Sequence, residues 1–207
     1  MSNDEVYASG LLNRALDPAT QPSEIRAFLH AEIDLLDSII GPGMALIDVG
    51  CGTGRHLALF GNRLRIGVGL DYEHTYVVEA HHRASARHLH FITGDATAVP
   101  IEARFDLATC LTNTWGTMGN KAGVLNEMRR LAVKPHTRLL SVFSEGSVPP
   151  RREWYRRFGH TVVEESAEHL MTDGGLRSEH FSQTRLRSLI GECFIRPLTD
   201  IAYVVLF

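Results

Sequence analysis

The stretch that decides the fold is Asp48-Val49-Gly50-Cys51-Gly52-Thr53-Gly54. It follows a short apolar run at 45–49, which predicts a buried strand, and it precedes a segment of helical character at 55–62. Glycines at such a turn let the backbone bend sharply and let a ligand approach the main chain without meeting a Cβ atom. The N–H groups at the start of the helix favour an anionic group. The sequence therefore predicts a ligand-binding turn between a strand and a helix.

The glycine spacing distinguishes between two classes of ligand. A turn that binds a dinucleotide has the pattern G-x-G-x-x-G. Counted from Gly50, the third glycine would fall at Arg55, and counted from Gly52 it would fall at Leu57, so neither register fits. The spacing here is G-x-G-x-G with Asp48 two residues before the first glycine, which fits the pattern for S-adenosylmethionine. A nicotinamide-dependent enzyme is therefore disfavoured.

Strand-like and helical segments alternate on both sides of this turn, after an amphipathic helix expected at 22–40. Such alternation predicts right-handed βαβ units that build a parallel sheet, and hence an α/β fold. Further strands are expected at 65–70, 89–92, 105–110 and 138–143, with helices at 74–87 and 121–131 between them.

The alternation ends after Phe143. Residues 145–160 are rich in Pro, Gly and Arg, and segments 161–171 and 176–181 flank a hairpin turn at Thr172-Asp173-Gly174-Gly175. A helix is then expected at 182–191 and short strands at 193–196 and 201–207. We expect one domain, 1–207, made of an N-terminal lid and helix (1–43), a cofactor-binding core (44–144), a substrate-side insertion (145–181) and a closing helix with strands (182–207).

Two aspartates follow neighbouring strands of the expected sheet. Asp71 ends the second strand, where its carboxylate can accept hydrogen bonds from both hydroxyls of a ribose. Asp95 ends the third strand and can accept from an adenine amino group. Either residue alone could cap a helix. Because ligands of open α/β sheets bind at the carboxyl ends of the strands, both together indicate a nucleoside site.

These features resemble the class I S-adenosylmethionine-dependent methyltransferases. The resemblance implies a seven-stranded, Rossmann-like sheet of order 3-2-1-4-5-7-6 with helices on both faces, the seventh strand antiparallel, and S-adenosylmethionine as cofactor. It also implies which residues bind the cofactor. They are Asp48, Gly50, Cys51, Gly52 and Gly54 at the methionine moiety, Asp71 and Tyr72 at the ribose, Asp95 and Ala96 at the adenine, and Leu111.

The expected fourth strand continues into Cys110-Leu111-Thr112-Asn113-Thr114-Trp115-Gly116, which is similar to the motif of glycine and sarcosine N-methyltransferases. The chain departs from that motif with Thr112 in place of glycine and Thr117 in place of a frequent histidine, which bears on the acceptor rather than the cofactor. Asn113 and Trp115 fall where a loop would meet the transferred methyl group, and both are candidate catalytic or substrate-binding residues. The alternative is a capping asparagine and a core tryptophan.

The remaining candidates lie in the insertion and near the N-terminus. Arg151 and Arg152 open a basic cluster at 151–157, which is either a clamp for an acceptor carboxylate or phosphate or a solvated helix face around two aromatic residues. His180 is either a general base or structural. Tyr7 belongs to an N-terminal segment that, with Leu11 and Leu12, would fold over the cofactor as a lid. No histidine has metal-ligand spacing, and we expect no metal.

Composition restricts the function further. The chain has 207 residues with a net charge of −3, so no general basic field attracts nucleic acid or membrane lipid. No apolar run approaches the roughly 20 residues of a membrane span. We expect a cytoplasmic monomer or homodimer, without a nucleic-acid or membrane partner, that methylates a nitrogen or oxygen atom of a small-molecule acceptor. The alternatives are a tRNA-modifying methyltransferase and a non-catalytic protein that binds S-adenosylmethionine.

Overall fold

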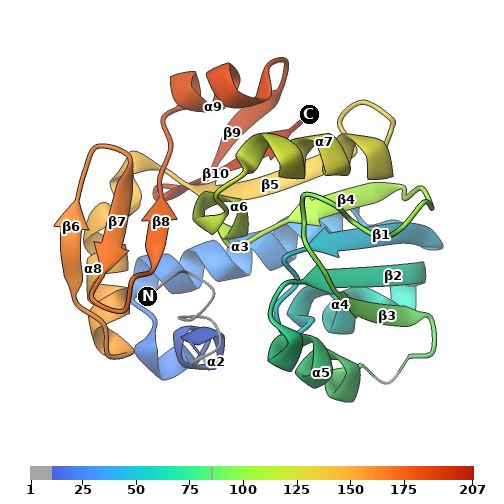
Figure 1. The fold of residues 1–207 in the computed structure, drawn as a ribbon, viewed down its shortest axis with the longest axis horizontal. Helices are drawn as coiled ribbons and strands as arrows, with labels where there is room; N and C mark the ends of the chain where they lie inside the picture. The colour runs from blue at the N-terminus through green and yellow to red at the C-terminus, as the bar shows by residue number, and fades with distance from the viewer. Residues whose placement is uncertain (1–10, 85) are drawn as a thin grey trace.

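The computed structural model describes residues 11–84 and 86–207 of the chain. Figure 1 shows a central sheet between helices, with a second, smaller sheet beside it. The candidate Tyr7 lies outside the described residues, as do the side chains of Leu11 and Leu12.

The central sheet has seven strands in the order β3-β2-β1-β4-β5-β10-β9. The first five are parallel to one another, and β10 is antiparallel to both β5 and β9. Numbered within this sheet alone, the order is the expected 3-2-1-4-5-7-6, which is thereby confirmed. The strands are β1 (Met44–Val49), β2 (Leu64–Asp71), β3 (Leu89–Thr93), β4 (Leu107–Cys110), β5 (Arg138–Phe143), β9 (Phe194–Thr199) and β10 (Ala202–Leu206).

Helices cover both faces of this sheet. The described helices are α2 (Leu11–Ala15), α3 (Ser23–Ile39), α4 (Arg55–Phe60), α5 (His74–Arg83), α6 (Thr114–Thr117), α7 (Lys121–Leu131), α8 (Val148–Arg157) and α9 (Gln183–Ile190), with 3₁₀ turns at Pro18–Thr20, Gly61–Arg63 and Glu145–Ser147. None of the helices in the described part of the chain is long and apolar enough to cross a membrane.

Side chains along β1 alternate between the two faces of the sheet, and this explains the two buried clusters. Ala45, Ile47 and Val49 point into one buried cluster, to which α7 and α9 contribute side chains. Leu46 points into the other, which α3, α4 and α5 complete. Because both faces of the strand are covered, its residues are almost all apolar, as is typical of a parallel sheet.

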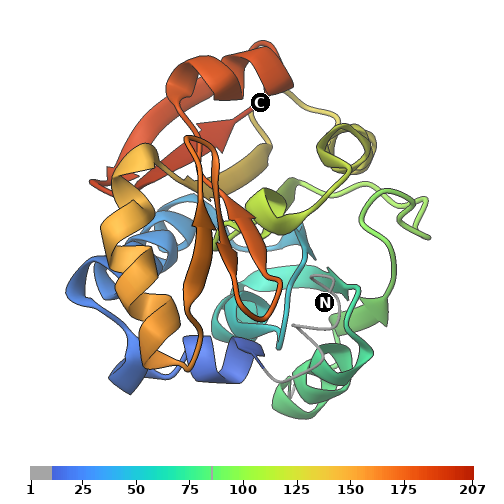
Figure 2. The same cartoon turned by 60° about the vertical axis from the view of Figure 1, so that its left-hand side comes forward.

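The expected hairpin exists but has one more strand than the sequence indicated. Strands β6 (Val162–Glu165), β7 (His169–Thr172) and β8 (Arg177–Glu179) form an antiparallel sheet in that order. The expectation of one long arm at 161–171 was wrong, because the Ser166 hydroxyl accepts the N–H groups of Glu168 and His169 and closes a turn there. Figures 1 and 2 show this small sheet lying between α8 and α6, on the side of the carboxyl ends of the parallel strands.

Candidate active site

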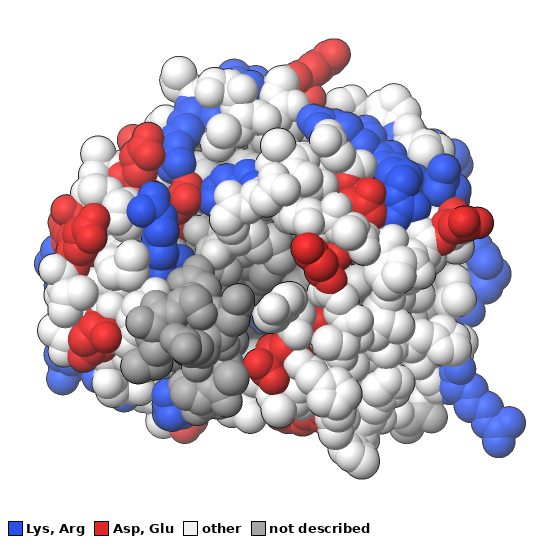
Figure 3. All heavy atoms as spheres, viewed as in Figure 1, with Lys and Arg blue, Asp and Glu red and all other residues white. Residues whose placement is uncertain are grey.

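A cavity of about 620 Å³ lies at the carboxyl ends of β1, β2 and β3 and extends to α8 and β8. Its volume is in the range of ligand cavities in proteins. Figure 3 shows this face of the molecule hollowed near its centre, with acidic and basic side chains interspersed around the hollow. The cavity has two ends that differ in chemistry, a polar end at the glycine turn and an aromatic end under the small sheet.

The glycine turn forms one wall of the polar end. Gly50 and Gly52 line the cavity with φ values of 73° and 53°, a region that favours glycine. The Gly50 N–H donates to the Leu70 carbonyl at 2.7 Å, so the turn is tied to the end of β2. A Cβ atom on Gly50 would collide with the Thr114 side chain. The backbone conformation therefore favours glycine at both positions, and close packing requires it at Gly50.

Asp71 lies at the end of β2 and holds the turn in place. One carboxylate oxygen accepts the Gly52 N–H at 2.7 Å, and the other accepts the Glu73 N–H at 2.9 Å. Burial raises the pKa of Asp71. Asp71 and the exposed Tyr72 both line the cavity. Since each carboxylate oxygen has a second lone pair, Asp71 can accept two further hydrogen bonds from a ligand.

Asp95 and Ala96 line the same end, as the sequence predicted for neighbouring strands. The sheet register pairs Asp71 with Thr93, which brings the two aspartates to the same edge. One oxygen of Asp95 accepts the N–H and the hydroxyl of Thr97 at 2.7 and 2.8 Å. No described Lys or Arg lines this end of the cavity. Carboxylate acceptors without cations fit the hydroxyl and amino donors of an adenosine.

Four of the residues expected to bind the cofactor lie behind the wall instead: Asp48, Cys51, Gly54 and Leu111. Asp48 is buried, accepts the Thr109 hydroxyl at 2.7 Å and lies 3.6 Å from the His56 ring nitrogen. A Cβ atom on Gly54 would collide with Phe91. The geometry gives Asp48 and Gly54 a supporting role beneath the turn, and their direct contact with the cofactor stays a prediction.

The loop after β4 has an unusual backbone. Thr112 and Asn113 are both left-handed, with φ values of 54° and 58°. Glu32 of α3, which is fully buried, accepts the Thr112 N–H at 2.5 Å and the Thr112 hydroxyl at 2.9 Å, and it also accepts the Ser141 hydroxyl. These bonds hold a residue type that the left-handed region disfavours. They explain how threonine can stand where the resembling motif has glycine.

Asn113 lines the cavity, but its amide is engaged in structural bonds. Its Nδ2 donates to the Ser178 hydroxyl and the Glu179 carbonyl, both at 3.1 Å, and its Oδ1 accepts the Phe143 N–H at 3.0 Å. The side chain thus joins the β4 loop to β5 and β8. This arrangement fixes the shape of the cavity wall between its two ends.

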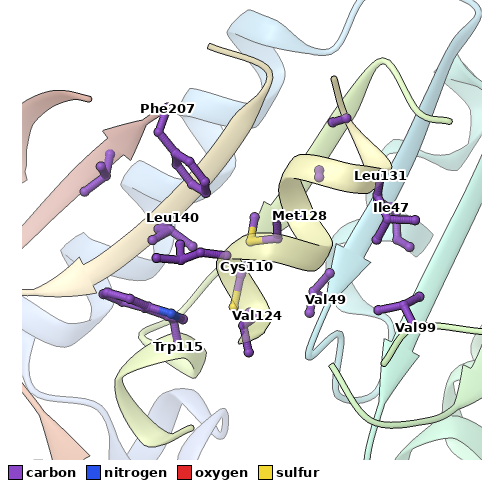
Figure 4. Close-up of a cluster of buried hydrophobic side chains, with 14 of the residues drawn as sticks. Ile47, Val49, Val99, Cys110, Trp115, Val124, Met128, Leu131, Leu140 and Phe207 are labelled. Atoms are coloured by element: carbon purple, nitrogen blue, oxygen red, sulfur yellow. The ribbon is translucent and has the colours of Figure 1, made fainter. Parts of the chain in front are cut away.

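Trp115 does not line the cavity. It is fully buried, stacks on Phe181 with ring centroids 5.1 Å apart, and donates its Nε1–H to the Lys121 carbonyl. Figure 4 shows it among core side chains that include Val124 and Leu140. The geometry therefore favours the alternative of a core tryptophan.

The basic cluster is not a clamp open to the cavity. Arg151 is fully buried behind the wall, and Arg152 forms an ion pair with Glu165 on the surface. Arg156 and Arg157 both pair with Glu153. The geometry favours the alternative of a helix face around buried aromatic residues, with Arg151 as the exception.

His180 is also buried outside the cavity lining. Burial, and then the nearby charge of Arg151, lower the pKa of this histidine. A neutral ring in this position accepts or donates hydrogen bonds within the wall, and its role as a general base stays a prediction.

The aromatic end of the cavity was not anticipated from the sequence. Phe143 of β5, Trp154 and Tyr155 of α8, Phe158 and Leu176 line it. The rings touch one another, with Trp154 and Phe158 centroids 5.6 Å apart and Trp154 stacked on Tyr155 at 6.0 Å. The sequence does indicate an aromatic cluster here, because Trp154, Tyr155 and Phe158 are spaced to lie on one face of a helix.

The role of Glu32 was also not predicted from the sequence, although its position indicates burial. It lies on the apolar stripe of α3, four residues after Phe28 and three after Leu29, where an acid has to find buried partners. Arg55 of α4 reaches the same carboxylate at 3.5 Å. Among the described residues no group of three or more potential metal ligands occurs.

Comparison with known proteins agrees with this geometry. Residues 46–135 match the family model of a methyltransferase domain. An uncharacterised protein, YjhP, of Escherichia coli (strain K12) is 30% identical over 99 residues, which are 45% of this chain and 39% of that protein. The chain thus spans well under half the length of this curated relative.

Solved structures share the fold over nearly the whole chain. A protein of Pyrococcus horikoshii OT3 superposes with a TM-score of 0.69 at 18% identity, covering 92% of this chain and 95% of that one. The magnesium protoporphyrin IX methyltransferase of Synechocystis PCC 6803, solved with bound S-adenosylhomocysteine, gives 0.65 at 13% identity, covering 98% and 97%. An amino pentose methyltransferase from Micromonospora echinaspora, solved with bound S-adenosylmethionine, gives 0.55 at 19%, covering 97% and 96%.

Proposed function

We propose that the chain uses S-adenosylmethionine to methylate a nitrogen or oxygen atom of a small molecule. The match of residues 46–135 to a methyltransferase domain supports this, as does the fold shared with structures solved with S-adenosylhomocysteine or S-adenosylmethionine bound. The observation that carries this proposal is the continuity of the cavity. A polar end suited to adenosine and a buried aromatic end next to β8 belong to one cavity. Donor and acceptor would therefore meet inside one cavity.

When bound, S-adenosylmethionine supplies a methyl group on a positively charged sulfur. The residues of this chain provide the binding geometry. Asp71 would accept the ribose hydroxyls, Asp95 the adenine amino group, and the Gly50–Gly52 turn would let the methionine part approach the backbone. Each of these residues lines the polar end. In-line transfer needs alignment more than acid–base chemistry, so binding at two fixed ends supplies most of the catalysis.

The burial of the aromatic end favours a small acceptor over a macromolecule. Tyr155 of α8, the adjoining Phe158 and Ser178 of β8 line this end. A tRNA-modifying enzyme needs a basic surface next to its cavity. The arginines at 152, 156 and 157, which could have provided one, are paired with Glu165 and Glu153.

We expect radiolabelled S-adenosylmethionine to transfer its methyl group to small molecules of a metabolite extract when the purified chain is added. A variant with Gly50→Val, whose side chain would collide with Thr114, serves as the inactive control. The readout is label in the small-molecule fraction after removal of protein and RNA. Label in tRNA or protein, with none in small molecules, would contradict the proposal.

A further inference from the structure

The guanidinium of Arg151 is fully buried without an acid partner. No Asp or Glu of the described residues lies within ion-pair distance of it, and its bonds go to neutral groups. Nη2 donates to the Ser178 carbonyl at 2.6 Å and to the Tyr155 hydroxyl at 3.2 Å. A charge buried without a counter-ion destabilises the fold. Because this unpaired guanidinium lies next to a cavity, its positive charge is available to a ligand.

This charge lies directly behind the aromatic end. The guanidinium carbon is 4.7 Å from the centre of the Phe143 ring and 5.7 Å from that of Tyr155. Both rings line the cavity, and Arg151 itself does not. One layer of side chains separates the charge from the ligand volume, and a charge is screened weakly across an apolar wall. The aromatic end is therefore favourable to a negative group.

Tyr155 links this charge to the cavity, because its side chain lines the cavity and its hydroxyl accepts hydrogen bonds from the guanidinium. Nε and Nη2 of Arg151 both donate to its oxygen, at 3.3 and 3.2 Å, so its hydrogen points away from the guanidinium. No described residue accepts that hydrogen, although Tyr155 is only 3% exposed. A buried donor without an acceptor is destabilising, and a ligand oxygen would satisfy it.

The neighbouring charges leave this preference in place. His180 has its Nδ1 3.4 Å from Arg151, and its pKa is lowered, so it adds no second cation. Glu179 lines the same part of the cavity, but Lys121 and Arg185 hold its carboxylate at 2.9 and 2.6 Å. The negative charge of Glu179 is neutralised within the wall, whereas the positive charge of Arg151 is not.

We propose that the aromatic end binds a flat, apolar acceptor that carries an oxyanion, a carboxylate or a phenolate, with Tyr155 as the hydrogen-bond donor and Arg151 as the residue that positions and polarises it. The inference rests on the proposed function, since it makes this molecule the methyl acceptor. It adds a chemical class and two specificity residues to that function.

Calorimetric titration of the full chain, saturated with S-adenosylhomocysteine, tests the proposal with three probes of similar shape. Benzoate is anionic, benzamide is neutral and benzylamine is cationic. We expect benzoate to bind at least about tenfold more tightly than benzamide, the effect of one hydrogen bond to a charged group, and benzylamine to bind most weakly. Equal binding of benzoate and benzamide would overturn the proposal.

Variants at two positions assign the preference to residues. Tyr155→Phe keeps the ring and removes the donor, so we expect benzoate affinity to fall about tenfold while benzamide affinity and S-adenosylhomocysteine affinity hardly change. Arg151→Met should have the same effect, and Arg151→Lys should keep part of the preference. Arg152→Met, one residue away but exposed, is the matched control and should change nothing.

Tyr155→Phe is decisive even if the buried Arg151 variants fail to fold. A Tyr155→Phe protein that prefers benzoate as strongly as the wild type would refute the role of this hydroxyl. Binding is measured without turnover, so the two proposals can fail separately. Anion-selective binding in a chain that methylates no small molecule would contradict the proposed function and leave the oxyanion site standing.

Discussion

Replacing Asp71 with alanine is expected to weaken S-adenosylmethionine binding by more than tenfold. The variant loses the acceptor for the ribose hydroxyls, and hydrogen bonds to a charged group contribute about 1.5–3 kcal/mol each. It also releases the N–H groups of Gly52 and Glu73, which the carboxylate now holds. Asp71→Asn keeps the volume of the side chain and should also lose affinity, because one of its ends becomes a donor.

Calorimetric titration with S-adenosylmethionine measures this effect. Asp34→Ala, which removes an exposed acid of α3 away from the cavity, is the control and should bind like the wild type. Since burial raises the pKa of Asp71, affinity should begin to fall at a higher pH than for an ordinary aspartate as the solution is acidified. Unchanged affinity in Asp71→Ala would mean that the ribose lies elsewhere.

Replacing Glu32 with alanine should destabilise the fold by about 3–5 kcal/mol, the range for removing one partner of a buried ionic network. The loss leaves the Thr112 N–H, the Ser141 hydroxyl and the Arg55 guanidinium without their shared acceptor. It also frees the left-handed backbone at 112–113, so the wall between the two ends of the cavity should loosen.

Urea denaturation measures the loss in the free energy of unfolding. Glu32→Gln keeps the shape and one acceptor oxygen, so it should lose less than Glu32→Ala. Asp34→Ala lies two residues further along the same helix on its exposed side and should stay within about 0.5 kcal/mol of the wild type. A Glu32→Ala protein that unfolds at the same urea concentration as Asp34→Ala would show that this network adds nothing to stability.

The strand order and the polar end of the cavity could be predicted because the signals are local. The glycine turn at 50–54 can be identified from its own residues, because its backbone conformation favours glycine. Asp71 and Asp95 each follow a strand, and the handedness of βαβ units determines which strands are neighbours. The carboxyl ends of parallel strands meet at one edge, so residues 24 positions apart could be placed together without any structure.

The aromatic end of the cavity could not be predicted, since it depends on contacts between distant segments. Glu32 meets Thr112 across 80 positions, and Arg151 bonds to Ser178 across 27. Composition indicates an exposed arginine cluster, because charged side chains are rarely buried. Which of the arginines turns inward is decided by packing against Phe143 and Tyr155. In a separate buried cluster, stacking on Phe181 places Trp115 in the core rather than in the cavity.

We propose that the cavity at the carboxyl ends of β1, β2 and β3 is the site for S-adenosylmethionine. Calorimetric titration of the wild-type chain with S-adenosylmethionine, and in a parallel experiment with NAD⁺, tests it most directly. We expect saturable binding of S-adenosylmethionine at one site per chain and no measurable binding of NAD⁺. Binding of NAD⁺ in preference to S-adenosylmethionine, or binding of neither, would contradict the claim.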